Sequence, residues 1–219
     1  MRSDKYEVNV VKSIIASVVF FIIGIILIVS SIADTISLSK GITDFNEMKC
    51  EEFQNGRFVQ GTLQFLDNGF AEEYMQEYGS SEKDVTSSYY LMQLLAHGDE
   101  LKYITVCFSK DTDIETADKM VTEMEEYYES GTMPDNATTM EFTGKVSKLD
   151  KEIVQLLYDR LIESDFGLDK EECSKYVCDY CITPCEIDTK SPVVFGTILL
   201  LVGVIGFVIS VLQFLRIKR

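Results

Sequence analysis

The 219-residue sequence contains no tryptophan, one histidine and three prolines, and its 36 acidic residues far outnumber its 20 lysines and arginines. Because His97 is the single histidine, nucleophilic or metal sites that depend on histidine are disfavoured. The G-x-S-x-G, H-E-x-x-H, P-loop and G-x-G-x-x-G patterns do not occur in it. An acidic surface also repels nucleic acid. We therefore predict a protein that is not an enzyme, with no catalytic residues, no cofactor and no nucleic-acid partner.

Two long runs, residues 13–33 and 192–215, carry no charged side chain. A helix of about 20 apolar residues spans a hydrocarbon core roughly 30 Å thick, so both runs are predicted to cross a membrane. A buried core helix is the alternative for each, but such a helix is rarely apolar on every face. Residues 31–33, Ser-Ile-Ala, also fit a signal-peptide cleavage site, although the first run exceeds the usual signal length of about 7 to 15 apolar residues.

Basic residues beside the two runs predict the topology. Residues 1–12 hold Arg2, Lys5 and Lys12, and residues 216–219 hold Arg216, Lys218 and Arg219. By the positive-inside rule, both termini of this multi-pass protein of the cell membrane are cytoplasmic, and residues 34–191 lie outside. This segment holds 14 of the 20 basic and 34 of the 36 acidic residues, a net charge of −20. We interpret the charge chiefly as a soluble surface; attraction of cations or of a basic partner is the alternative.

The outer segment has the pattern of one α+β domain. Residues 44–53 are predicted as a short helix, 57–65 as a strand, and 88–95 with 101–108 as a β-hairpin. A capping box, Thr112-x-x-Glu115, opens a helix that ends at Gly131. A strand at 139–148, with a bulge at Gly144, precedes a helix running from Asp150 to Gly167 and a last strand near 176–182. The prediction is a mixed, largely antiparallel sheet with two main helices, flanked by two transmembrane helices.

The order of these segments resembles a known family. The stretches NGRFVQGTLQFL, TSSYYLMQLL, LKYITVCFS, DTDIETADKM and FTGKVSKLD, placed between two apolar runs, resemble an uncharacterised two-span membrane-protein family of Gram-positive bacteria, whose function is unknown. The resemblance implies a surface-exposed module between two anchors and supplies no catalytic residues. Members commonly have an aromatic, apolar strand where this chain has VCDYCI, so the cysteines there are particular to this protein or its near relatives.

Four of the six cysteines, Cys173, Cys178, Cys181 and Cys185, occur within thirteen residues, and the other two are Cys50 and Cys107. An iron–sulfur cluster is disfavoured because the distal cysteine and the C-P ending are missing. The four clustered thiolates are candidate zinc ligands, but structural zinc sites usually join two separated pairs. An outward location favours one or more disulfides among the six, with reduced apolar cysteines as the alternative.

The spacing of the cysteines adds one geometric prediction. In a strand over 176–182, Cys178 and Cys181 point to opposite faces because their separation is odd. They are then poor partners for each other, whereas Cys173 or Cys185 could reach one of them. Cys50 and Cys107 are also open as partners, if the fold brings them close.

Two functional hypotheses follow. The first is a membrane-anchored extracytoplasmic interaction or assembly module, whose partners are the bilayer and another protein or a second copy of the chain. The second is a redox or metal-binding membrane protein that uses the cluster of residues 173–185.

Acid pairs such as Glu72-Glu73 are interpreted as solvated surface, and Tyr89-Tyr90 as core packing. Ser13-x-x-x-Ser17 and Gly206-x-x-x-Ser210 permit close helix packing. The sequence identifies neither a ligand nor a disulfide pairing.

Overall fold

The chain folds as two units, described by a computed structural model that covers residues 2–76, 84–97, 102–132, 134–163 and 169–217. One unit combines the two ends of the chain, Met1–Ser39 and Ile187–Arg219, and the other comprises Lys40–Glu186. The two predicted apolar runs thus lie in one unit, and nearly all of the predicted outer domain forms the other.

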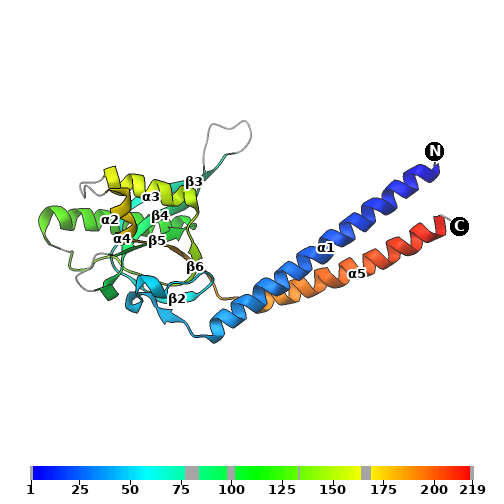
Figure 1. Cartoon of the computed structure of the whole chain (residues 1–219), viewed down its shortest axis with the longest axis horizontal. Coiled ribbons are helices and arrows are strands. Elements are labelled where there is room, and N and C mark those ends of the chain that lie inside the picture. The colour runs from blue at the N-terminus through cyan, green and yellow to red at the C-terminus, as the bar shows by residue number, and fades with distance from the viewer. Residues whose placement is uncertain (1, 77–83, 98–101, 133, 164–168, 218–219) are drawn as a thin grey trace. The chain divides into compact units, whose positions relative to one another are not determined.

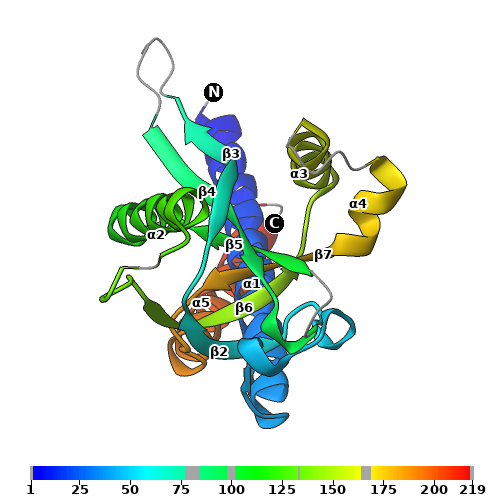
Figure 2. The ribbon, with the colours of Figure 1, turned by 90° about the vertical axis from the view of Figure 1, so that its left-hand side faces the viewer.

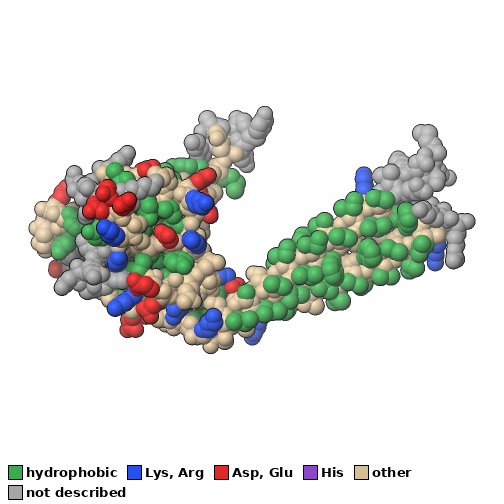
Figure 3. All heavy atoms as spheres, viewed as in Figure 1, with side chains coloured by type: hydrophobic (Ala, Val, Ile, Leu, Met, Phe, Trp, Pro, Cys, Tyr) green, Lys and Arg blue, Asp and Glu red, His purple; other side chains and the backbone are tan. Residues whose placement is uncertain are grey.

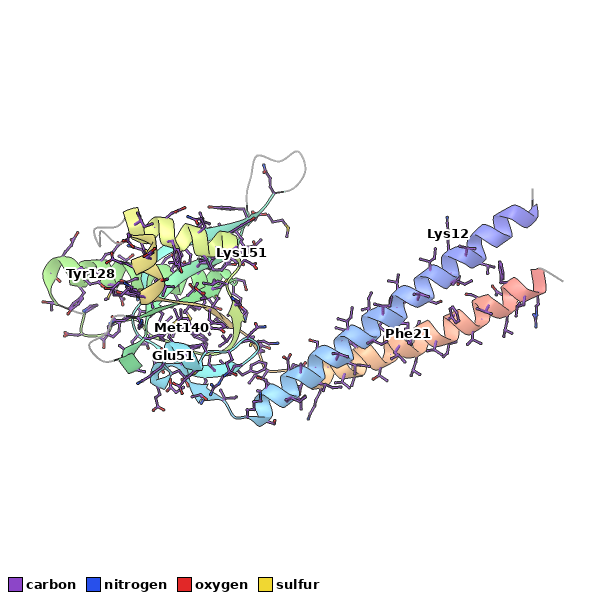
Figure 4. All side chains as sticks on the ribbon, in the orientation of Figure 1. Lys12, Phe21, Glu51, Tyr128, Met140 and Lys151 are labelled. Carbon is purple, nitrogen blue, oxygen red and sulfur yellow. A yellow bond between two sulfur atoms is a disulfide. The ribbon has the colours of Figure 1, made fainter. Side chains whose placement is uncertain are left out.

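The terminal unit is an antiparallel pair of long helices, α1 (Arg2–Ser39) and α5 (Lys190–Ile217). They lie side by side, with the N-terminal end of α1 next to the C-terminal end of α5 (Figure 1). Both are long and apolar enough to cross a membrane, over residues 10–39 and 190–216. The uncharged runs 13–33 and 192–215 lie inside them, and Figure 4 marks Phe21 within α1 and Lys12 near its N-terminal end.

Small residues hold α1 and α5 together. The Ser13 and Ser210 hydroxyls are 2.8 Å apart, and the Ser31 hydroxyl donates to the Thr189 carbonyl at 2.6 Å. A Cβ atom added to Gly24 would lie 2.7 Å from the Gly196 carbonyl oxygen, so the two backbones are in contact there. The small-residue spacings in the sequence therefore serve packing between the two helices of one chain.

The second unit is built on a seven-stranded mixed sheet with the order β1-β2-β6-β7-β5-β4-β3. Four neighbouring pairs are antiparallel, whereas β1–β2 and β5–β7 are parallel. The α+β prediction with a largely antiparallel sheet is confirmed, including the hairpin formed by β4 and β5. The strands are β1 (Thr43–Asp44), β2 (Phe58–Leu63), β3 (Asp67–Met75), β4 (Asp84–Gln93), β5 (Tyr103–Phe108), β6 (Met140–Lys148) and β7 (Val177–Pro184).

Helices cover both faces of this sheet (Figure 2). On the α2 face lie α2 (Asp111–Ser130) and the 3-10 turns η1 (Phe45–Glu47) and η2 (Cys50–Glu52); on the α3/α4 face lie α3 (Lys151–Glu163) and α4 (Lys170–Tyr176). A further 3-10 turn, η3 (Leu95–His97), follows β4. Each face has its own apolar core because strand side chains alternate between the two sides.

The two cores share no residue. On the α2 face, the core includes Phe45, Phe53, Met92, Phe108, Met120 and Ile182. On the α3/α4 face, it includes Leu91, Tyr103, Cys107, Leu157, Leu161, Cys173 and Cys181. In the space-filling view, hydrophobic side chains cover the visible surface of the helix pair, whereas charged side chains concentrate on the sheet unit (Figure 3).

Several predicted elements need correction. The short helix expected at 44–53 is two separate 3-10 turns, the first capped by the Asp44 carboxylate, which accepts from the Asn46 amide at 2.9 Å. Strand β3 and helix α4 were missed. Residue Thr112 does not cap α2: the N-cap is Lys110, and the Ile114 amide donates to the Lys110 carbonyl at 3.0 Å.

The predicted roles of two glycines, Gly144 and Gly131, can be compared with the structure. The bulge predicted at Gly144 is wrong, because the β2–β6 register continues through it. A Cβ atom at Gly144 would lie 2.6 Å from Ile182 Cγ2, so glycine allows β7 to approach closely. The helix end predicted at Gly131 is confirmed: its φ of 70° is left-handed, and its amide donates to the Tyr127 carbonyl at 2.8 Å. The other predicted stop, Gly167, lies outside the described residues.

Candidate functional site

The run of four cysteines is divided among three structural environments. Cys173 lies in α4, Cys178 and Cys181 lie in β7, and Cys185 follows the strand. Helix α4 begins at a capping box in which the Asp169 carboxylate accepts from the Glu171 and Glu172 amides. This D-x-x-E pattern could have been recognised in the sequence. The cluster of residues 173–185 is therefore not one site.

Cys178 points to the α2 face and forms a disulfide with Cys50. Their Cα atoms are 5.6 Å apart, within the normal range for a disulfide, and 128 residues separate them in sequence. The bond joins η2 to β7 at the middle of the sheet. Of the partners that the sequence left open, Cys178 pairs with Cys50 and not with Cys173 or Cys185 from within the cluster. The opposite orientation predicted for Cys178 and Cys181 is confirmed, because they belong to the two different cores.

Cys181 points to the α3/α4 face and lies next to Cys107 on β5. Hydrogen bonding from the Cys181 thiol lowers the pKa of Cys107, whereas the same contact and burial raise the pKa of Cys181. Tyr89 pairs with Cys107 across β4 and β5, and its hydroxyl donates to the Glu73 carboxylate at 2.7 Å. Two thiols thus meet in a mostly apolar layer with one phenol–carboxylate pair at its edge.

The two remaining cysteines differ in burial. Cys173 is fully buried, and burial raises the pKa of its thiol, which disfavours the thiolate that binds metals. Cys185 is half-buried. Within the part of the chain that the structure describes, no group of three or more His, Cys, Asp or Glu side chains is placed to hold a metal. His97 ends η3, and its side chain lies outside the described residues.

A second feature is a cleft on the α2 face, bounded by β3, β4 and α2. Its volume is about 470 Å3, within the range of ligand-binding pockets. The lining residues are Gly69, Phe70, Ala71, Glu72, Tyr74, Ser88, Tyr90 and Asp118. We call it the Ser88 cleft. The described residues of its lining supply two carboxylates and three hydroxyls, and none of them is a lysine or arginine.

Two phenol–carboxylate pairs line the Ser88 cleft. Tyr90 on β4 donates to the Asp118 carboxylate of α2 at 2.6 Å, and Tyr74 donates to Glu72, its neighbour on β3. Burial, followed by the hydrogen bond to Asp118, raises the pKa of Tyr90 far above its ordinary value, so the phenol keeps its proton. The hydrogen bond to Glu72 raises the pKa of Tyr74.

Between these pairs lies Ser88. It sits opposite Glu72 in the β3–β4 register and is 3% exposed, yet its hydroxyl has no hydrogen-bond partner among the described residues. An unpaired buried hydroxyl costs about 1 to 3 kcal/mol. The arrangement can accept hydrogen bonds from a ligand through several oxygens and favours positive charge.

The Ser88 cleft does not follow from pairs of adjacent residues, because the two members of each pair lie on opposite faces of the sheet. Of the pair Glu72-Glu73, Glu72 lines the cleft, whereas Glu73 bonds Tyr89 on the other face. Of the pair Tyr89-Tyr90, Tyr90 faces α2 and Tyr89 faces the thiols. The two-residue period of β4 could have shown that Ser88 and Tyr90 share a face. No local pattern predicts that α2 brings Asp118 to that face.

A family model described as a domain of unknown function (DUF8577) matches residues 7–216. No curated protein and no solved structure matches the chain. The match covers nearly all of both long helices and the whole sheet unit. It agrees with the resemblance to an uncharacterised family, while bacterial origin and two-span character stay predictions.

Proposed function

This chain belongs to the DUF8577 family of unknown function, and from that premise we propose that it is a two-span membrane protein whose sheet unit faces outward and binds a partner. In this proposal, the apolar side chains of α1 and α5 contact the lipid of the membrane. The sheet unit, held at both ends by these helices, presents the Ser88 cleft. The role is recognition or assembly at the cell surface and not catalysis.

The exposed apolar surface of the helix pair supports the membrane location. Phe195 on α5 is 65% exposed, and most other large apolar side chains of α1 and α5 are exposed as well. An apolar surface of this extent is unfavourable in water and favourable in lipid, where helices satisfy their own backbone hydrogen bonds. The hydroxyls of Ser17, Ser31 and Ser210 are instead buried in the helix pair, away from that surface.

Charge and disulfide chemistry support the outward direction of the sheet unit. Arg2, Lys5 and Lys12 lie in the N-terminal part of α1, and Arg216 lies in the last turn of α5. The helix pair brings these two ends together (Figure 1). These ends favour the cytoplasm. The Cys50–Cys178 bond lies in the sheet unit, and disulfides persist in oxidising compartments.

One observation carries the binding role: in the Ser88 cleft, a buried hydroxyl without a hydrogen-bond partner among the described residues lies beside two carboxylates. Cores normally satisfy such groups, so an unsatisfied hydroxyl in an open cleft favours a ligand site. We infer that the partner contributes hydrogen-bond donors there.

Topology is tested in intact cells with a membrane-impermeant maleimide. Ser39→Cys and Thr189→Cys are expected to react from outside, whereas Lys218→Cys is expected to react only after lysis, with the wild-type chain giving the background from native cysteines. Reaction of Lys218→Cys in intact cells with protection of the other two would reverse the proposed topology.

Partner binding is tested by in-cell photo-crosslinking. A photoreactive residue at Glu72, on the cleft, is expected to give a discrete crosslinked product. The matched control is the same residue at Glu152, which lies exposed on α3 on the opposite face. Equal products from both positions, or none from Glu72, would contradict a role for the cleft.

A thiol–disulfide redox function is the second candidate, and the Cys107–Cys181 contact favours it. The Cys107 thiolate would attack the disulfide of an oxidant and displace one of its sulfurs, and the Cys181 thiol would then displace the other. The Cys107–Cys181 bond forms, the oxidant's S–S bond breaks, and the oxidant leaves as two thiols that have taken up the two electrons and two protons. The lowered pKa of Cys107 makes it the attacking thiolate.

Thiol titration of the full-length protein separates the two candidates. A redox role predicts that mild oxidation removes two thiols in the wild type but none in Cys107→Ala, and that the bond re-forms reversibly against a glutathione buffer. Retention of all thiols in the wild type under the same oxidation removes this candidate.

A further inference from the structure

The strand register around the Ser88 cleft brings three oxygen-bearing side chains together. Glu72 lies opposite Ser88 in the β3–β4 register, and Tyr90, two residues after Ser88 on the same face, reaches Asp118 of α2. Three segments far apart in the sequence thus contribute Glu72, Ser88 and Asp118. Their contribution to one cleft is a property of the tertiary fold.

The hydrogen-bond state of these oxygens leaves acceptors available. The phenol bonds use Oε2 of Glu72 and Oδ1 of Asp118, so the second oxygen of each carboxylate can accept from a ligand. The buried hydroxyl of Ser88 adds a third acceptor. An alkylammonium group has three N–H donors, which equals this number of acceptors.

Charge and shape indicate the class of ligand further. Two carboxylates attract a cation, and none of the described lining residues is a lysine or arginine that would oppose it. The net charge of −20 over residues 34–191 adds to this field. A cleft of about 470 Å3 is far larger than a lone ammonium ion, so the ligand carries an organic body. The phenol rings of Tyr74 and Tyr90 favour a cation near their faces.

We propose that the Ser88 cleft binds a primary alkylammonium group, with Glu72 and Asp118 as its charge partners and Ser88 as a hydrogen-bond acceptor. This inference rests on the proposed binding role and names the chemistry of its ligand. The ammonium group belongs either to a lysine of a partner protein or to a free amine.

The test is calorimetric titration of the full-length protein in nonionic detergent micelles. The probes are cadaverine, as a free amine, and acetyl-Gly-Lys-Gly-amide, as a protein lysine; acetyl-Gly-norleucine-Gly-amide is the uncharged control. Saturable binding of at least one amine, absent for the norleucine peptide and weakened by salt, is expected. Tighter binding of the lysine peptide identifies a protein source, and tighter binding of cadaverine identifies a free amine.

Three variants test the assignment of the residues. Glu72→Gln and Asp118→Asn are each expected to weaken binding by about tenfold or more, because each removes a hydrogen bond to a charged group. Ser88→Ala is expected to weaken it less. Glu73→Gln is the matched control, since Glu73 is adjacent in sequence but lies on the other face, and it should bind as the wild type does. Circular dichroism checks that every variant is folded.

Two results would overturn the proposal: no saturable binding of either amine to folded wild type, or equal binding by wild type, Glu72→Gln and Asp118→Asn. Saturable binding of calcium with no binding of amines would assign the cleft to a metal and reject the ammonium class. A crosslink at Glu72 without amine binding leaves the binding role intact and rejects only the ligand class. Amine binding by a sheet unit that labelling places inside the cell supports the site and rejects the outward function.

Discussion

The two faces of the sheet differ in the oxidation state of their cysteines and in the surroundings of their buried hydroxyls. On the α2 face, Cys178 is oxidised with Cys50, and Ser88 lines a cleft. On the α3/α4 face, Cys181 and Cys107 are thiols in contact, and Thr105 is 0% exposed. Within the part of the chain that the structure describes, neither the Ser88 nor the Thr105 hydroxyl has a hydrogen-bond partner. Cys178 and Cys181 lie three residues apart on one strand, so local sequence does not explain their different states. Their different neighbours explain them: η2 brings Cys50 to Cys178, whereas Cys181 contacts Cys107 of β5.

The largest effect is expected on the α2 face, on removing the disulfide. Cys50→Ala should lower the free energy of unfolding by about 4 kcal/mol, because the bond closes a loop of well over 100 residues in the unfolded chain. Guanidinium unfolding of the full-length protein in micelles, followed by circular dichroism, measures this. Reductant should destabilise the wild type by a similar amount and leave Cys50→Ala unchanged. A variant as stable as the oxidised wild type would show that the bond does not form.

A smaller loss is expected from the apolar core of the α3/α4 face. Leu157 on α3 is 0% exposed, so Leu157→Ala should cost about 3 kcal/mol through lost burial and a cavity. Its neighbour Leu156 is 48% exposed, and Leu156→Ala is the matched control, expected to change stability by less than about 1 kcal/mol. Equal losses from both variants would mean that α3 packs in another orientation.

Alkaline pH should lower the free energy of unfolding through Tyr103, which lies in the core of the α3/α4 face. Burial, with a smaller contribution from Asp67, raises the pKa of Tyr103 to about 12, whereas an unfolded tyrosine has a pKa of about 10. Below pH 10 both states are protonated and stability is complete. Between pH 10 and 12 the unfolded state loses the proton first, so the free energy of unfolding falls, by at most about 2 to 3 kcal/mol for this group.

Tyr103→Phe should remove this share of the pH dependence, seen as a shallower loss of stability above pH 10. Tyr90→Phe tests the α2 face in the same way, since burial also raises the pKa of Tyr90. Stability curves that are parallel for the wild type and Tyr103→Phe would contradict the assignment.

The smallest effect is expected at Thr105, and it has the opposite sign. Thr105→Val keeps the shape of the side chain and removes a buried hydroxyl without a partner among the described residues, so it should stabilise the protein by about 1 kcal/mol. Thr86→Val on β4 is the control: its hydroxyl donates to the Glu73 carbonyl at 3.1 Å, and the change should be neutral or slightly destabilising. A loss of stability in Thr105→Val would indicate that its hydroxyl is bonded.

Local patterns predicted the elements better than their contacts. The hairpin of β4 and β5 and the end of α2 at Gly131 depend on neighbouring residues, and both were predicted. Strand β3 was missed because its run DNGFAEEYM is mostly half-buried or exposed and lacks a clear apolar alternation. The role of Gly144 was mistaken, since its cause is β7, which lies about forty residues later.

Three features can be predicted from the residues alone: the two apolar helices, the α+β character of the sheet unit and the opposite orientation of Cys178 and Cys181. Each of these follows from composition or from a period of a few residues. The folded chain was needed to find that Cys178 pairs with Cys50, that Cys181 contacts Cys107, and that Glu72, Ser88 and Asp118 line one cleft. Such contacts depend on the order in which strands pair and on which helix covers each face, and long-range packing sets both.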